Sequence, residues 1–196
     1  MPGWSARYGF VGTGAITRAM VEGLSTVDDP PEIVVSPRGA ATSAALAARF
    51  GNVRVAPGNQ AVVDAAPCVV LAPRPGDASA VLDDLVLAPE HVVVSVVAGL
   101  SYDDLRAAAA PARGVARAIP LPSVAGRRGL VPVFPPEPEA VELFGRLGEV
   151  VALADDHATP GGLNEQVRTY VRAHGVHALV ATALDGVAAR VAGPRA

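Results

Sequence analysis

A glycine-rich segment near the start of the chain, Gly12 to Thr17, has the residue types and spacing that can hold phosphate groups. It follows a short apolar run, Tyr8 to Val11, and opens a segment whose apolar residues recur at helical spacing. Gly12 permits a tight turn, and Gly14 has no Cβ, so an anion can approach the backbone. The helix that follows offers free N–H groups and the positive end of its dipole. The residues that we predict to contact a dinucleotide here are Gly12, Gly14, Ala15 and Ile16.

The alternative interpretation is an ordinary glycine-rich turn. The combination of strand, turn and helix disfavours it, because this context is what confirms a match to the fingerprint. Thr17 stands where a third glycine is usual. It is small enough to permit close packing of the helix against the strand, so we keep the prediction of a dinucleotide-binding turn.

The end of the second expected strand bears on which dinucleotide is bound. NAD-binding folds usually place Asp or Glu there, where it binds the ribose hydroxyls. Here the strand ends in Ser36, Pro37 and Arg38, with no acid. An arginine fork and a serine hydroxyl suit a 2′-phosphate, which an acid would repel. These residues favour NADP over NAD; the alternative is that Arg38 is a solvated loop charge.

Further candidate residues follow the later strands. Ligands of open α/β sheets bind at the carboxyl ends of the strands. Arg74 comes directly after the fourth expected strand, and small residues follow the fifth, where they would allow a flat ring to approach. The additional residues that we predict to bind the cofactor are Asn59, Ala72, Arg74, Pro75, Ala98 and Gly99.

Strands and helices alternate along most of the chain. The expected strands are 8–11, 32–36, 53–55, 68–72, 91–95, 114–119, 130–134 and 149–154, and the expected helices are 16–24, 41–50, 59–65, 77–85, 101–110 and 138–147. Such alternation predicts an α/β fold with a doubly wound, mainly parallel Rossmann-type sheet. We expect residues 1–154 to form this domain. Residues 155–196 carry no strand pattern and are expected to form a helical C-terminal segment.

Composition excludes several classes of function. The formal net charge is −3 and no basic stretch recurs, so nothing indicates a nucleic acid or an anionic membrane as partner. The apolar runs are strand-sized and the N-terminus has no apolar signal region, so we expect a soluble, cytoplasmic protein. One cysteine, Cys68, and four scattered histidines give no metal-binding spacing, and we predict no metal.

With these residues in hand, the chain resembles the pyrroline-5-carboxylate reductase family. Its Gly-Phe-(Ile/Val)-Gly-x-Gly-x-Met-Ala run is similar to residues 9–17, and its Ala-Val-Lys-Pro to residues 72–75, with Arg for Lys. Its Ser-x-x-Ala-Gly is matched by residues 95–99. Its Arg-x-Met-Pro-Asn-Thr-Pro is similar to residues 117–123, although the Asn and Thr are lost.

The C-terminal segment carries a further likeness. Residues 159–164, Thr-Pro-Gly-Gly-Leu-Asn, are similar to the family's Ser-Pro-Gly-Gly-Thr-Thr, a loop whose backbone N–H groups bind the substrate carboxylate. Two glycines at a helix start make an anion-binding nest. The resemblance implies these substrate-binding residues: Pro120, Thr159, Gly161, Gly162 and Asn164. The helices that the family has between its last Rossmann strand and this loop find no counterpart here.

The resemblance implies an oxidoreductase of proline biosynthesis that transfers hydride from NADPH to a cyclic imine carboxylate and acts as a homodimer. A protonated imine is already electrophilic, so a strong catalytic acid is not required, and we assign no catalytic residue. The alternative is a non-catalytic NADP-binding or regulatory relative with a decayed substrate domain. A reductase that uses a deazaflavin donor with NADP shares the glycine turn, but the Pro-Gly-Gly loop argues against it. Arg127 and Arg128 are either a solvated loop or partners of a substrate carboxylate.

Overall fold

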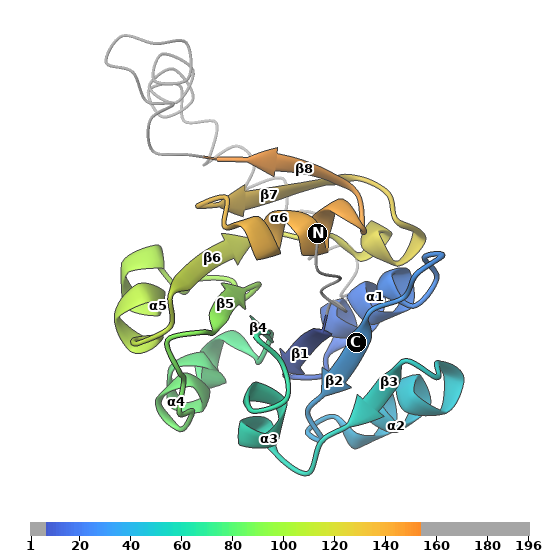
Figure 1. The fold of residues 1–196 in the computed structure, drawn as a ribbon, viewed down its shortest axis with the longest axis horizontal. Coiled ribbons are helices and arrows are strands. Elements are labelled where there is room, and N and C mark those ends of the chain that lie inside the picture. The colour runs from blue at the N-terminus through green and yellow to red at the C-terminus, as the bar shows by residue number, and fades with distance from the viewer. Residues whose placement is uncertain (1–6, 154–196) are drawn as a thin grey trace, which may run out of the picture. The chain divides into compact units, whose positions relative to one another are not determined.

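Eight strands form one sheet in the order β3-β2-β1-β4-β5-β6-β7-β8 (Figure 1). The computed structural model describes residues 7–153. The strands are β1 Arg7–Val11, β2 Glu32–Val35, β3 Val53–Val55, β4 Cys68–Leu71, β5 Val92–Ser95, β6 Gly114–Ala118, β7 Leu130–Phe134 and β8 Glu149–Ala152. All eight lie within one or two residues of their predicted ends, because each is a short apolar run bounded by turn residues.

Neighbouring strands from β3 to β6 are parallel, β7 runs antiparallel to β6, and β8 is parallel to β7. The predicted α/β fold with a mainly parallel, Rossmann-type sheet is thereby confirmed. The reversal at β7 is the part that the alternating pattern did not reveal. Its physical reason is the connection from β6, which runs through a short 3₁₀ turn, η2 (Pro122–Gly126), in place of a crossover helix.

Helices cover both faces of the sheet. They are α1 Ala15–Leu24, α2 Ala40–Arg49, α3 Asn59–Val63, α4 Ala78–Asp83, α5 Tyr102–Ala108 and α6 Pro138–Gly145, and a second 3₁₀ turn, η1 (Pro75–Asp77), precedes α4. One core cluster joins side chains of α1, α2, α6 and η2 to one face. The other joins α3, α4 and α5 to the opposite face. Because strand side chains alternate between faces, Phe10 belongs to the first cluster and Val11 to the second.

Small residues allow close packing between the layers. A Cβ on Gly23 of α1 would lie 2.3 Å from the carbonyl oxygen of Val124 in η2, so α1 and η2 are in direct backbone contact. A Cβ on Gly9 of β1 would lie 2.8 Å from the Val62 side chain of α3. The first contact joins α1 to η2 within one layer, and the second packs α3 against β1, the strand that leads into the glycine turn.

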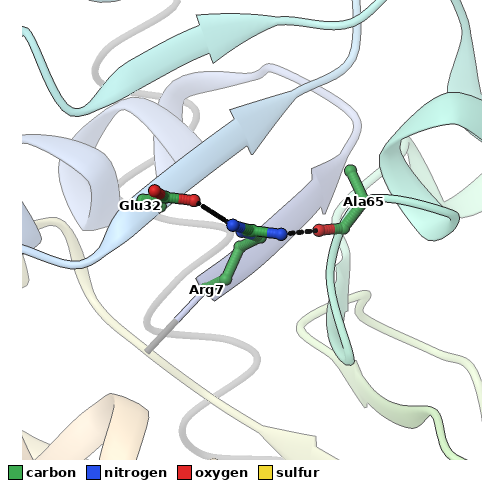
Figure 2. A network of polar contacts seen from close by, with 3 residues as sticks. All are labelled: Arg7, Glu32 and Ala65. Atoms are coloured by element: carbon green, nitrogen blue, oxygen red, sulfur yellow. Dashed lines mark hydrogen bonds and ion pairs between the residues drawn. The ribbon is translucent and has the colours of Figure 1, made fainter. Parts of the chain in front are cut away.

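The other end of β1 is held by polar contacts (Figure 2). The Nε of Arg7 donates to the Glu32 carboxylate over 2.6 Å, and a second guanidinium nitrogen lies 3.4 Å from the carbonyl oxygen of Ala65. Arg7 pairs with Glu32 at the start of both strands, opposite the edge at which the glycine turn lies. This contact therefore aligns β1, β2 and the end of the α3 layer without entering the candidate site.

No helix among the described residues is long and apolar enough to cross a membrane. Residues 7–153 also contain no cluster of His, Cys, Asp or Glu that could hold a metal ion. The predicted helical segment 155–196 lies outside the described residues, as do the substrate-binding predictions for Thr159, Gly161, Gly162 and Asn164.

Candidate functional site

The candidate site lies at the carboxyl ends of β1 and β4, the neighbouring strands at which the chain changes direction across the sheet. Crossovers lead away from this point to opposite faces of the sheet, which leaves a crevice between them. The structure shows a cleft of about 400 Å³ there. Its lining residues are Val11, Gly12, Thr13, Gly14, Arg38, Gly39, Asn59, Ala72, Pro73, Arg74, Asp77 and Val81.

Two glycines of the turn have different roles. Gly12 has φ = +99°, a conformation that favours glycine, and a Cβ there would lie 2.5 Å from the carbonyl group of Ala72. Gly14 has φ = −91° and ψ = −167°, which any residue adopts, and a Cβ there would meet nothing within 4 Å. The fold therefore requires glycine at position 12. At position 14 the absent side chain leaves open space at the cleft.

Helix α1 begins at this open space. No side chain caps its N-terminus at Gly14, and its first turn contains no acid. The first backbone N–H groups of an α-helix have no partner within the helix. The start of α1 thus presents unpaired donors and the positive end of the helix dipole, which is the arrangement that binds a phosphate.

Helix α2 begins at the same cleft. Its N-cap is Gly39, which lines the cleft at φ = +87°, and no side chain caps the helix or places an acid in its first turn. A Cβ on Gly39 would lie 2.6 Å from the carbonyl oxygen of Thr13, so the loop before α2 rests directly on the glycine turn. The positive ends of two helix dipoles therefore lie at one cleft.

Two arginines line the cleft from different strands. Arg38 follows β2 and Arg74 follows β4, and both residues are exposed. The ion pairs among residues 7–153 involve other arginines, so neither guanidinium is neutralised by a described carboxylate. Among the described residues that line the cleft, Asp77 is the single acidic one. The cleft is consequently suited to an anionic ligand.

A buried hydrogen-bonded network holds the turn. The Gly12 N–H donates to the Ser36 hydroxyl over 2.9 Å, and the Thr13 hydroxyl donates to the Ser36 carbonyl oxygen over 2.8 Å. On the other side, the Thr17 hydroxyl donates to the Gly12 carbonyl oxygen over 2.7 Å. Thr13, Thr17 and Ser36 are all buried. The turn is thus fixed by the ends of both β2 and α1.

The structure brings together several of the predicted cofactor residues. Gly12, Gly14, Arg38, Asn59, Ala72 and Arg74 line the cleft, and Ala15 and Ile16 form the first turn of α1 beside it. Pro75, Ala98 and Gly99 instead line a neighbouring depression between α4 and α5. Pro120 is buried after the end of β6 and is not among the lining residues of the cleft.

The prediction for Ser36 needs a correction. A direct contact with the 2′-phosphate requires an accessible hydroxyl, but Ser36 is 0% exposed and its oxygen already accepts from Gly12. Sequence reasoning also missed Thr13 and Gly39 as parts of the site. The signal for Gly39 was its place between Arg38 and an Ala-rich helix, which is typical of a turn residue at a helix start.

The titratable groups with large shifts lie away from the cleft. The pKa of Cys68 is raised to about 12, chiefly by burial and to a smaller extent by nearby Glu139 and Glu142. Burial also raises the pKa of Tyr8, its register partner on β1. Both side chains belong to the core cluster. Arg127 and Arg128 line a separate depression with Arg146 and Glu149.

A Rossmann-type sheet with this crevice is the fold of NAD(P)-dependent oxidoreductases. Residues 7–99 match the family model described as NADP oxidoreductase, coenzyme F420-dependent. No curated protein matches the chain at the level of sequence.

Solved structures carry the likeness further. The pyrroline-5-carboxylate reductase of Streptococcus pyogenes aligns with a TM-score of 0.64 at 17% identity, over 98% of this chain and 82% of that one. The Plasmodium falciparum pyrroline carboxylate reductase with NADP bound aligns with a TM-score of 0.62 at 15% identity, over 97% of this chain and 80% of that one. An imine reductase from Aspergillus terreus aligns with a TM-score of 0.64 at 17% identity, over 93% of this chain and 65% of that one. The predicted resemblance to pyrroline-5-carboxylate reductases is confirmed, and at these identities it establishes the fold.

Proposed function

We propose that the chain binds NADPH in this cleft and transfers hydride to the C=N bond of a cyclic imine carboxylate. The observation that carries the proposal is the open space at Gly14, at the uncapped start of α1 and beside Arg38. That combination fits the diphosphate and the 2′-phosphate of one nucleotide. The residues are therefore consistent with the cofactor that the fold implies.

Binding of the diphosphate is assigned to the backbone. The space left by Gly14 lets a phosphate approach the first N–H groups of α1, at Ala15 and Ile16, without a steric conflict. Gly12 shapes the turn beneath them. Because these donors belong to the backbone, they are independent of pH and provide affinity for NADPH and NADH alike.

Selectivity for NADPH is assigned to Arg38 and the start of α2. Arg38 follows β2, the strand after which NAD-binding folds place an acid, and residues 36–39 contain no acid. Its guanidinium can bind a 2′-phosphate through two parallel hydrogen bonds. The uncapped N-terminus of α2, one residue further along, adds to the attraction.

A bound nicotinamide would supply the hydride. The chain's own contribution is then orientation and exclusion of water. Small residues after β5, Ala98 and Gly99, are exposed and leave room for a flat ring, and Arg74 lies between them and the diphosphate turn in the order of the strands. The substrate-side predictions for Pro120, Thr159, Gly161, Gly162 and Asn164 follow from the family resemblance and belong to this proposal, as does a homodimer, which sedimentation analysis would test.

The test is a titration followed by an assay of turnover. Calorimetry of the full chain should give a Kd for NADPH at least tenfold below that for NADH, a ratio that corresponds to about 1.4 kcal/mol. Arg38→Ala should remove most of that preference. Arg54→Ala is the matched control, since Arg54 is exposed on β3 outside the cleft and the same charge is lost. Oxidation of NADPH by pyrroline-5-carboxylate, followed by absorbance, then tests catalysis.

A non-catalytic NADP-binding relative is the second candidate function. The observation that favours it is Leu121, an apolar side chain that is 57% exposed where the reductase motif carries Asn. This candidate predicts NADPH binding without oxidation of NADPH by pyrroline-5-carboxylate or by other cyclic imines. The reductase proposal predicts turnover with at least one of them.

A further inference from the structure

Ser36 stands at the point where the loop carrying Arg38 meets the phosphate-binding turn. Its backbone N–H donates to the Phe10 carbonyl oxygen over 2.9 Å, which continues the pairing of β1 and β2 beyond the end of β2. Its side chain is completely buried and directed at the turn, where it accepts from Gly12. The hydroxyl therefore lies between two segments of the site and faces neither the cleft nor solvent.

The hydrogen bonds around Ser36 close a cycle. The Thr13 hydroxyl donates to the Ser36 carbonyl oxygen over 2.8 Å, and the two hydroxyl oxygens lie 3.3 Å apart. Because Thr13 gives its proton to that carbonyl, the Ser36 hydroxyl is the donor between the two hydroxyls. Ser36 thus accepts from Gly12 and donates to Thr13, so its proton is committed inside the protein.

A second contact holds the same loop. The backbone of Gly39 approaches the carbonyl oxygen of Thr13 so closely that a Cβ on Gly39 would lie 2.6 Å from it. Arg38 therefore lies between Ser36, which is hydrogen-bonded to Thr13, and Gly39, whose backbone packs against Thr13. The diphosphate turn and the loop with Arg38 form one preorganised unit, and preorganisation lowers the entropic cost of binding.

We propose that Ser36 is a positioning residue, whose hydroxyl holds the diphosphate turn and the Arg38 loop in register and does not itself bind the 2′-phosphate. This inference rests on the proposed binding of NADPH. It separates two roles at the end of β2: Ser36 sets the affinity for both cofactors, and Arg38 sets the choice between them.

The two roles differ in what they predict for NADH. Loss of the Ser36 hydroxyl leaves the partly buried Gly12 N–H without its acceptor, so the turn shifts under the diphosphate that NADH and NADPH share. Ser36→Ala should therefore raise Kd for both cofactors by a similar factor, roughly five- to tenfold. A direct ligand of the 2′-phosphate would affect NADPH alone.

Thr13 supplies a matched pair of variants. Thr13→Val removes the donor to Ser36 with little change of shape, and Thr13→Ser keeps it. We expect Thr13→Val to raise both Kd values as Ser36→Ala does, and Thr13→Ser to restore them to within about twofold of the wild-type chain. Thr26→Val controls for loss of a hydroxyl elsewhere, since Thr26 bonds the Gly23 carbonyl oxygen at the far end of α1. It should leave both Kd values unchanged.

Calorimetric titration of the full-length variants with NADPH and with NADH decides the matter. An increase in Kd confined to NADPH, or no increase for Ser36→Ala, would overturn the proposal. An isotope-labelled protein without cofactor gives an independent readout: the Gly12 amide should exchange faster in Ser36→Ala than in the wild-type chain. If the wild-type chain binds neither cofactor, the proposed function fails, while an unchanged Gly12 exchange rate would refute the positioning role by itself.

Discussion

Gly12 and Ala72 approach each other so closely that a Cβ on Gly12 would lie 2.5 Å from both the carbonyl carbon and the carbonyl oxygen of Ala72. The contact joins the turn after β1 to the end of β4, the two strands between which the cleft opens. A Cβ on Gly14, two residues further on, would meet no other atom within 4 Å. One glycine is thus required by the fold, and the other leaves space at the site.

This difference predicts opposite behaviour for two alanine variants. Gly12→Ala combines a backbone clash with a positive φ, so we expect it to lower the free energy of unfolding by about 2–4 kcal/mol. Gly14→Ala should change that energy by less than about 0.5 kcal/mol, because its backbone conformation is ordinary and its surroundings are open. Denaturant unfolding of both variants measures this.

For cofactor binding, the informative variant is Gly14→Ala. Gly14→Ala should weaken NADPH and NADH by about tenfold or more while the protein stays folded, since the new methyl group occupies the approach of the diphosphate. Unchanged affinity in this stable variant would show that the diphosphate lies elsewhere.

Arg38→Asp should invert the choice of cofactor. An acid after the second strand accepts hydrogen bonds from ribose hydroxyls and repels a 2′-phosphate. We expect Kd for NADPH to rise by about a hundredfold, and Kd for NADH to stay level or fall.

Affinity of the wild-type chain for NADPH should also weaken with added salt more steeply than its affinity for NADH, because exposed charges are screened. Parallel titrations at low and high salt check both expectations.

The ion pair between Arg113 and Glu139 predicts a dependence of stability on acid pH. Burial acts to raise the pKa of the Glu139 carboxyl, but the hydrogen bond from Arg113 opposes it and the net shift is downward. A carboxyl with a lowered pKa stabilises the fold above its ordinary pKa of 4.5, and that contribution is lost as the pH falls through the folded-state value. Glu139→Gln should therefore be less stable than the wild-type chain near neutral pH by less than about 1 kcal/mol, because the pair is partly exposed.

The difference between Glu139→Gln and the wild-type chain should vanish when urea unfolding is repeated below about pH 3. Glu142→Gln is the control on the same helix, since Glu142 also pairs with an arginine, Arg146, but its carboxylate is more exposed than that of Glu139. A pH-independent gap for Glu139→Gln would mean that packing, rather than charge, accounts for it.

Cys68 predicts a loss of stability in alkali. Its pKa is raised from 9.0 to about 12, chiefly by burial, so the folded state keeps a proton that the unfolded chain releases. Stability is then complete below about pH 9 and should fall by about 1.4 kcal/mol per pH unit above it. Cys68→Ala should flatten this slope, although the raised pKa of Tyr8 leaves part of the pH dependence of stability in place at higher pH.

The buried thiol should also resist Ellman's reagent until the protein unfolds, and rapid labelling of the native chain would contradict the burial.

The sequence by itself determined the fold class and the place of the cleft. Apolar runs such as Cys68–Leu71 and turn residues such as Gly12 are local signals, and the end of a parallel strand is where the fold binds its ligands. Gly12, Gly14, Arg38, Asn59 and Arg74 could be chosen on that ground before any contact was known.

Only the tertiary structure decided which of those residues face the cleft and which hold other residues in position. Ser36 looked like a ligand because serine can donate to phosphate, but its direction depends on the pairing of β2 with β1, which buries the hydroxyl against Gly12. The reversal of β7 and the contact of η2 with Gly23 depend likewise on segments far apart along the chain. Local patterns report which backbone conformations are favoured, whereas burial and hydrogen-bond partners are set by what the rest of the chain packs against each residue.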